Sequence, residues 1–141
     1  MAVRTAAVLK TNIPIGTTLP NAQAHHDIID TFEDRCAKLE TRVVSAKTAN
    51  YTATATDTSR VITFNAAAEV TFTIPNTLLA GWNCTIVQLG AGQVTVAVTG
   101  GALRHPESHT KTSAQYAAAT LTVYANAGSA PQVSFVGQTA V

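Results

Sequence analysis

One short segment, His105-Pro-Glu107-Ser-His109, gathers side chains of the types that bind metal ions. Imidazole nitrogens and carboxylate oxygens are common ligands of zinc. Two histidines four residues apart share one face only if they lie on a helix, and Pro106 disfavours a helix here. The sequence therefore favours a polar loop over a metal site.

His25 is a second histidine whose position could matter for chemistry. It falls at a core position of a heptad pattern in the N-terminal part of the chain. If that pattern drives self-association, one imidazole per chain would point towards the axis of the oligomer. Such rings would hold a metal ion, an anion or water, or they would simply pack and titrate.

Catalytic side chains form no recognisable group. Paired carboxylates occur only within residues 27–34, where they lie on the outer face of an expected helix, and the other acids are scattered over expected turns. Gly90-Ala-Gly92 joins two expected strands, with no helix N-terminus to receive a phosphate. We therefore predict a protein that is not an enzyme, with no catalytic residue, no cofactor site and no metal.

A heptad pattern organises the N-terminal part, with apolar positions separated alternately by three and four residues. Asn21 can cap the first turn, so we predict one long helix over residues 21–44. A narrow apolar stripe needs a partner, and Arg35 and Glu40 would pair between parallel neighbours, which favours a parallel homo-oligomer, with a trimeric coiled coil as the candidate. The alternative is a helix that packs on the β domain of its own chain. The expected oligomer interface consists of Ala22, His25, Ile29, Phe32, Arg35, Cys36, Leu39, Glu40 and Val43.

The composition limits the possible partners. Of 141 residues only 12% are charged, and the net charge is +1, whereas soluble domains carry roughly 25% charged residues. No basic cluster is present, which argues against nucleic acid, and no apolar run approaches the ~20 residues of a membrane span. Cys36 and Cys84 lie in different expected elements and are interpreted as free thiols. A monomer with so few charges is poorly protected from association. We therefore expect neighbouring subunits to cover much of its surface.

Residues 51–141 alternate apolar and polar side chains and are rich in threonine, which is typical of strands. We predict a mainly β fold: an extended N-terminal arm over residues 1–20, the helix over 21–44, and an antiparallel β-sandwich or small barrel over 51–141. VQLGAGQVTV, at 87–96, is the best-defined predicted hairpin. The predicted core consists of Val61, Phe64, Val70, Phe72, Ile74, Ile86, Val94, Val96, Leu121, Val123, Val133 and Phe135.

Several short motifs follow one another in this β region. They are Tyr51 with alternating threonines, VTFTIP at 70–75, VQLGAGQVTV at 87–96, ALR at 102–104, QYAAATL at 115–121 and FVGQ at 135–138. In this order they resemble a small β domain found near the ends of many tailed-phage fibre and head-decoration proteins. The segment at 13–35 is similar to the short pre-helix and helix that precede such domains.

The resemblance implies a trimeric virion protein without chemistry of its own. We therefore expect a bacteriophage structural protein, a small homotrimeric fibre or capsid decoration protein that attaches to capsid or tail proteins through its N-terminal part. The alternative is a tail-fibre module that binds a receptor or a host-surface glycan. Sugar sites often use exposed aromatic rings, for which Trp82, Tyr116 and Tyr124 are the candidates.

Overall fold

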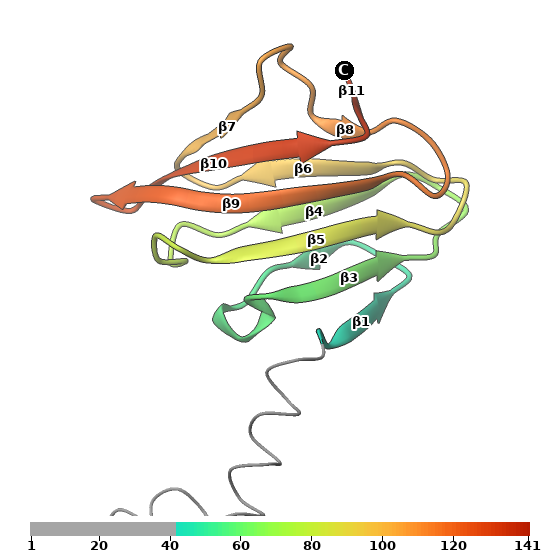
Figure 1. The fold of residues 1–141 in the computed structure, drawn as a ribbon, viewed down its shortest axis with the longest axis horizontal. Coiled ribbons are helices and arrows are strands. Elements are labelled where there is room, and N and C mark those ends of the chain that lie inside the picture. Colours follow the sequence, from blue (N-terminus) through green and yellow to red (C-terminus); the bar gives the residue numbers. More distant parts are fainter. Residues whose placement is uncertain (1–41) are drawn as a thin grey trace, which may run out of the picture. The chain divides into compact units, whose positions relative to one another are not determined.

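The computed structural model describes residues 42–141, most of which belong to one compact unit, residues 43–141, called the β module below (Figure 1). The strands of the described part form two packed sheets, and β1 to β9 alternate between them. Their bounds are β1 (Val44–Lys47), β2 (Tyr51–Thr52), β3 (Arg60–Phe64), β4 (Val70–Ile74), β5 (Asn83–Gln88), β6 (Val94–Val98), β7 (Ala102–Arg104), β8 (Lys111–Thr112), β9 (Ala118–Ala127), β10 (Ala130–Gly137) and β11 (Thr139–Ala140), with a 3-10 turn η1 (Ala55–Asp57).

The first six strands wind as a short solenoid. β1, β3 and β5 run parallel in a six-stranded sheet of order β1-β3-β5-β9-β10-β7, and β2, β4 and β6 run parallel in a five-stranded sheet of order β11-β8-β6-β4-β2. Partners in the second and third coils are 24 residues apart, since Ile62 pairs with Ile86 and Phe72 with Val96. Each coil thus packs on the one before it, as in a β-helix.

Later strands close the solenoid with antiparallel pairs. β9 returns along β5, and β10 forms a hairpin with β9. β8 pairs with β6 and β11 pairs with β8, both antiparallel, at the other sheet. After β6 the pairing is therefore mostly antiparallel, and the exception is β7, which pairs parallel with β10 at the edge of the six-stranded sheet (Figure 1).

The hairpin predicted for residues 87–96 is wrong. β5 and β6 lie in different sheets, so the chain between them is an arc that crosses from one sheet to the other. The backbone amide of Gly92 donates to the carbonyl of Ala66, in the arc of the preceding coil, at 2.9 Å. A hairpin and a stacked arc both need alternating strands and a flexible turn, so this sequence pattern fits either.

The predicted fold class also needs correction. Two packed sheets are present, but the sandwich is not antiparallel throughout, because four strand pairs of the first half are parallel. Residues 42–141 contain no helix of seven residues or more, and Val44, the predicted end of the long helix, begins β1. Strand pairing competes with helix formation at Val44, because β1 pairs in register with β3. The rest of the predicted helix, residues 21–41, and the arm over 1–20 lie outside the described residues.

The apolar side chains of the alternating strands fill the space between the two sheets. Eleven of the twelve predicted core residues are buried. The exception is Val61: Ile62 is fully buried, and Val61 faces outward on the same strand. The buried residues that the prediction omitted include Leu78, Trp82 and Cys84. Burial, together with the charge of Asp57, raises the pKa of the Cys84 thiol to about 12, so this cysteine is an inert core residue.

A buried polar pair fixes the arc between β5 and β6. Gln88 and Thr112 are both fully buried, and the hydroxyl of Thr112 donates to the side-chain carbonyl of Gln88. The amide of Gln88 donates to the carbonyl of Gly90 at 3.0 Å, and the Thr112 hydroxyl oxygen accepts the backbone N–H of Val94 at 2.9 Å. Because both side chains are satisfied, their burial fixes the arc at little cost.

Asp57 organises the arc between β2 and β3. Its side chain is 2% exposed, and its Oδ2 accepts the hydroxyl of Tyr51 and both the backbone N–H and the hydroxyl of Thr54, each at 2.8 Å. Burial alone would raise the pKa of Asp57, but these hydrogen bonds and the charge of Arg60 outweigh it and hold the pKa below its ordinary value. The ionised carboxylate therefore belongs to the folded structure.

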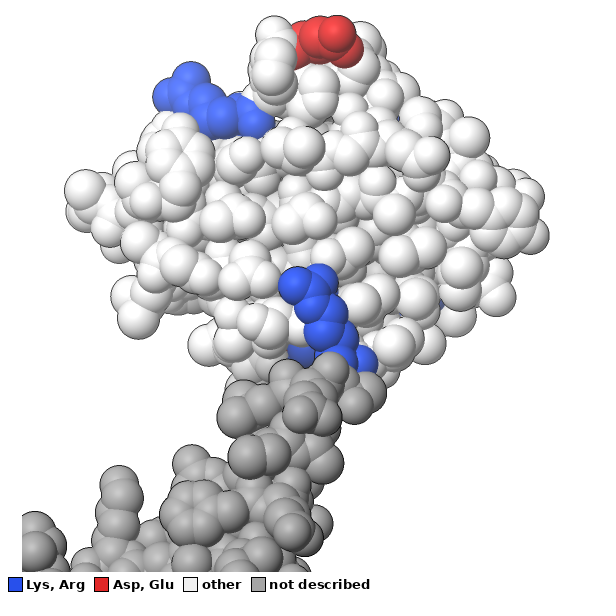
Figure 2. Space-filling view, viewed as in Figure 1, with Lys and Arg blue, Asp and Glu red and all other residues white. Residues whose placement is uncertain are grey.

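Charged side chains are sparse on the face drawn in Figure 2. Basic side chains appear at its upper left and lower centre, and acidic side chains at its top, with uncharged residues between them. Among the described residues, no helix is long and apolar enough to cross a membrane.

Candidate functional site: the histidine loop

The loop between β7 and β8 contains the segment that the sequence singled out. Its first residues form a tight turn in which the N–H of Ser108 donates to the carbonyl of His105 at 3.1 Å. Pro106 occupies the second position of this turn, where its fixed φ is favourable, and Ser108 follows with a φ of 58°. The turn reverses the chain and brings His109 back beside His105.

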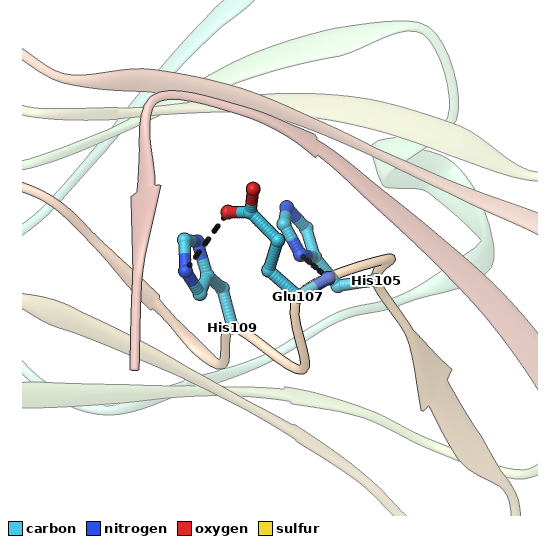
Figure 3. A group of neighbouring side chains, drawn as sticks. All are labelled: His105, Glu107 and His109. Atoms are coloured by element: carbon cyan, nitrogen blue, oxygen red, sulfur yellow. Dashed lines mark hydrogen bonds and ion pairs between the residues drawn. The ribbon is translucent and has the colours of Figure 1, made fainter.

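The two imidazole rings stack with their centroids 4.5 Å apart and their planes 15° from parallel. The Nε2 of His109 lies 3.2 Å from a carboxylate oxygen of Glu107. The backbone N–H of Glu107 donates to the Nδ1 of His105 at 3.1 Å (Figure 3). Three potential metal ligands from five consecutive residues therefore converge on one point.

Thr139, on β11, joins the two rings from the other side. Its hydroxyl oxygen lies 2.9 Å from the Nε2 of His105 and 2.9 Å from the Nδ1 of His109. Because the Nδ1 of His105 is an acceptor, its Nε2 carries the proton and donates to Thr139 when the ring is neutral. The Thr139 hydroxyl then donates to His109, whose remaining N–H faces Glu107.

The cluster is open on one side. The side chain of His109 is 19% exposed and that of Glu107 is 73% exposed. A hollow of about 580 Å³ lies beside the rings and is also lined by Arg104 and Ser134. The histidines are thus held by the fold, while the carboxylate is free to move and a small solute can reach it.

The sequence predicted a polar loop here, and a loop is present. The reasoning that a loop would keep the histidines apart is wrong, because the Pro106 turn places them as close as a helix would. The signal that could have revealed this is a proline at the second position of a turn between two histidines. Thr139 is thirty residues beyond His109 and gives no local signal at all.

The candidate sugar-binding aromatics lie in different environments. Trp82 is only 5% exposed, and its indole N–H donates to the carbonyl of Thr54 at 3.0 Å, so it serves the core. Tyr116 is 70% exposed and has a φ of 67°, and Tyr124 is 54% exposed. Trp82 offers no open platform for a sugar, while the two tyrosines do present their rings to solvent.

Of the predicted oligomer interface, Val43 alone falls among the described residues. Its side chain is 54% exposed, and its carbonyl accepts the N–H of Val61 at 3.0 Å. The interface residues Ala22, His25, Ile29, Phe32, Arg35, Cys36, Leu39 and Glu40 lie outside the described part.

The motifs that carry the phage resemblance serve the fold. The side-chain amide of Gln93 donates to the carbonyl of Thr112 at 2.8 Å. The amide of Gln115 donates to the carbonyl of Leu89 at 2.8 Å, and Gln138 accepts the N–H of Ala118 at 3.1 Å. Gln93 and Gln138 each tie a loop to a strand distant in sequence, and Gln115 ties one loop to another, so these motif residues hold the fold together.

Comparison of the chain with protein-family models, with curated proteins and with solved structures finds no match.

Proposed function

We propose that this chain is a non-enzymatic structural protein of a bacteriophage virion. It acts as a small homotrimeric fibre or capsid decoration protein, joined to capsid or tail proteins through its N-terminal part. Two things support the proposal: the resemblance of its motifs to phage fibre and head-decoration domains, and the use of those motifs to build a rigid β module.

The observation that carries the proposal is an uncharged row across the outer face of the six-stranded sheet. Val44, Val61, Thr85, Thr120 and Val136 are paired in register on five adjacent strands. Val44 is 62% exposed and Val136 is 61% exposed. We call these five residues the outer row.

Positions beside the outer row are uncharged as well. They are Ala46, Thr63, Val87, Ala118, Thr122 and Ser134, and the exception is Arg104, in register with Ser134 on the edge strand β7. Solvent-facing strands usually carry charges that oppose edge and face association. A level surface of hydroxyl and short aliphatic side chains lacks that protection, which favours a face that is covered in the assembled particle.

A second copy of this chain is the occupant that fits the face best. In a homotrimer three copies of the outer row can surround the threefold axis, so uncharged faces meet there and none brings a charge that needs a counter-charge. A partner with an ordinary surface would bring charged groups that the outer row cannot pair, and burying them unpaired is costly. Self-association is therefore the interpretation that the composition of the face supports.

Thr120→Glu tests the role of the outer row. The substitution adds one charge per chain to the centre of the face, and we expect it to lower the mass of the protein in solution to that of a monomer. Thr73→Glu is the matched control, because Thr73 lies on a central strand of the other sheet with its side chain outward. Light scattering would contradict the proposed contact if both variants kept the mass of the unaltered protein.

Deletion of residues 1–18 tests the attachment to the particle. We expect the truncated protein to stay folded and soluble and to be missing from purified phage particles. Mass spectrometry of particles carrying either form would measure this. Normal incorporation of the truncated form would show that the arm is not the anchor, and absence of the full chain from particles would contradict the virion role itself.

A further inference from the structure

We propose that His105, Glu107 and His109 form a binding site for one divalent transition-metal ion of the zinc class. One possible ligand atom of each residue lies within 4.8 Å of the corresponding atoms of the other two. This inference is independent of the virion role, because it depends only on the geometry of one loop.

The separations suit chelation after a small movement. Zinc lies about 2.0–2.2 Å from its nitrogen and oxygen ligands, so two ligands of one ion are at most about 4 Å apart. The Pro106 turn already places the two imidazoles side by side, with centroids 4.5 Å apart, and the rings must tilt from their 15° interplanar angle so that one in-plane lone pair of each points at the ion. Glu107, with a side chain 73% exposed, can close the remaining gap by changing rotamer.

The surrounding groups can orient both imidazoles around an ion. A histidine that binds a metal through one nitrogen needs a hydrogen-bond partner for the other. The nitrogens of His109 face Thr139 and Glu107, and those of His105 face Thr139 and the backbone N–H of Glu107. An ion bound to the Nδ1 of His105 and the Nε2 of His109 would leave the other nitrogen of each ring protonated. Both of those N–H groups face the hydroxyl oxygen of Thr139 on β11, which can accept their hydrogen bonds. The ion would replace the Glu107 N–H at the Nδ1 of His105.

The ligand set selects the class of ion. Two imidazoles and one carboxylate suit zinc, cobalt and nickel, whereas calcium and magnesium require oxygen ligands. Three protein ligands leave room for water from the adjacent hollow to complete the coordination. The bound ion would tie the β7–β8 loop to itself and, through Thr139, to the C-terminal strand.

A purely structural role competes with this one. Without an ion, the hydrogen bonds through Thr139 and Glu107 already satisfy both rings, so the cluster could serve only to hold the loop. The two roles differ in what happens when zinc is added. A structural cluster takes up no ion, and an ion site takes up one per chain.

The test is calorimetric titration of the untagged full chain with zinc chloride, compared among variants. We expect about one zinc ion per chain for the unaltered protein. Glu107→Gln keeps the size of an exposed side chain, so it should fold normally and bind zinc at least about 10-fold more weakly, since even outer-shell changes cost that much. His109→Ala should abolish the binding event.

His25→Ala/His26→Ala is the matched control, because these are the chain's other two histidines. We expect this double variant to keep the one zinc ion, and millimolar calcium not to compete. Uptake of no zinc by the unaltered protein would overturn the proposal. So would binding that Glu107→Gln leaves unchanged, or binding that disappears in the His25→Ala/His26→Ala variant.

Discussion

Replacing Gly92 with alanine is expected to lower the free energy of unfolding by about 3 kcal/mol or more, one of the largest effects available in this chain. A Cβ atom at Gly92 would lie 1.9 Å from the carbonyl oxygen of Ala68 and 2.2 Å from its carbonyl carbon. Both atoms belong to the backbone of the preceding coil, so no side chain can move aside. The two stacked arcs would have to separate.

Gly128→Ala is the control for this experiment. Gly128 has a φ of 63°, and a Cβ atom added there would have nothing within 4 Å, so alanine meets backbone strain alone, about 1–2 kcal/mol. Urea unfolding followed by far-UV circular dichroism compares the two variants. If the Gly92→Ala protein were at least as stable as the Gly128→Ala protein, the coils would not stack as closely as described.

Asp57→Ala is expected to destabilise the β module by about 3 kcal/mol at neutral pH. The substitution removes the acceptor of three hydrogen bonds and leaves the N–H of Thr54 and the hydroxyl of Tyr51 without their partner in a partly buried arc. Unfolding at pH 7 by urea measures the loss. A change below about 0.5 kcal/mol, typical of surface substitutions, would contradict the role given to Asp57.

Asp57→Asn tests the pH dependence that accompanies this network. The folded pKa of Asp57 is lowered, so its contribution to stability is present above the unfolded pKa of about 3.9 and is lost as the pH falls through the folded value. Stability of the unaltered protein should therefore fall as the pH drops below about 4, and Asp57→Asn should flatten that fall. Glu69→Gln, at an exposed acid, is the control and should leave the acid dependence unchanged. If stability fell equally with pH in all three proteins, Asp57 would not be the cause of the acid dependence.

Alternation in the sequence predicted most strands well, because a strand between two layers must bury every second side chain. β4 lies within the motif VTFTIP at 70–75 and β7 coincides with ALR at 102–104, and the predicted core positions of β4, β9 and β10 face the core. In β3, however, the alternation does not show which residues face the core. Val61, Ile62 and Phe64 are all apolar, and only pairing with β5 decides that Ile62 points inward.

In the histidine loop, too, the sequence predicts some features and the tertiary structure decides the others. Its composition and its lack of helix could be predicted from five residues, since Pro106 excludes the helix. The stacking of the rings, at 4.5 Å, depends on the turn, and their orientation depends on Thr139 from the last strand. No local pattern connects residue 139 with residue 105.

The sequence by itself determined the strand character of residues 51–141, most of the core and the low charge of the chain. These properties are local, because each follows from the chemistry of a residue and its near neighbours. The tertiary structure decided which strands pair and in which direction, and so whether Gly90-Ala-Gly92 turns back in one sheet or crosses to the other. That choice depends on contacts between coils 24 residues apart, as between Ile62 and Ile86, which lie beyond the reach of any periodicity within one strand.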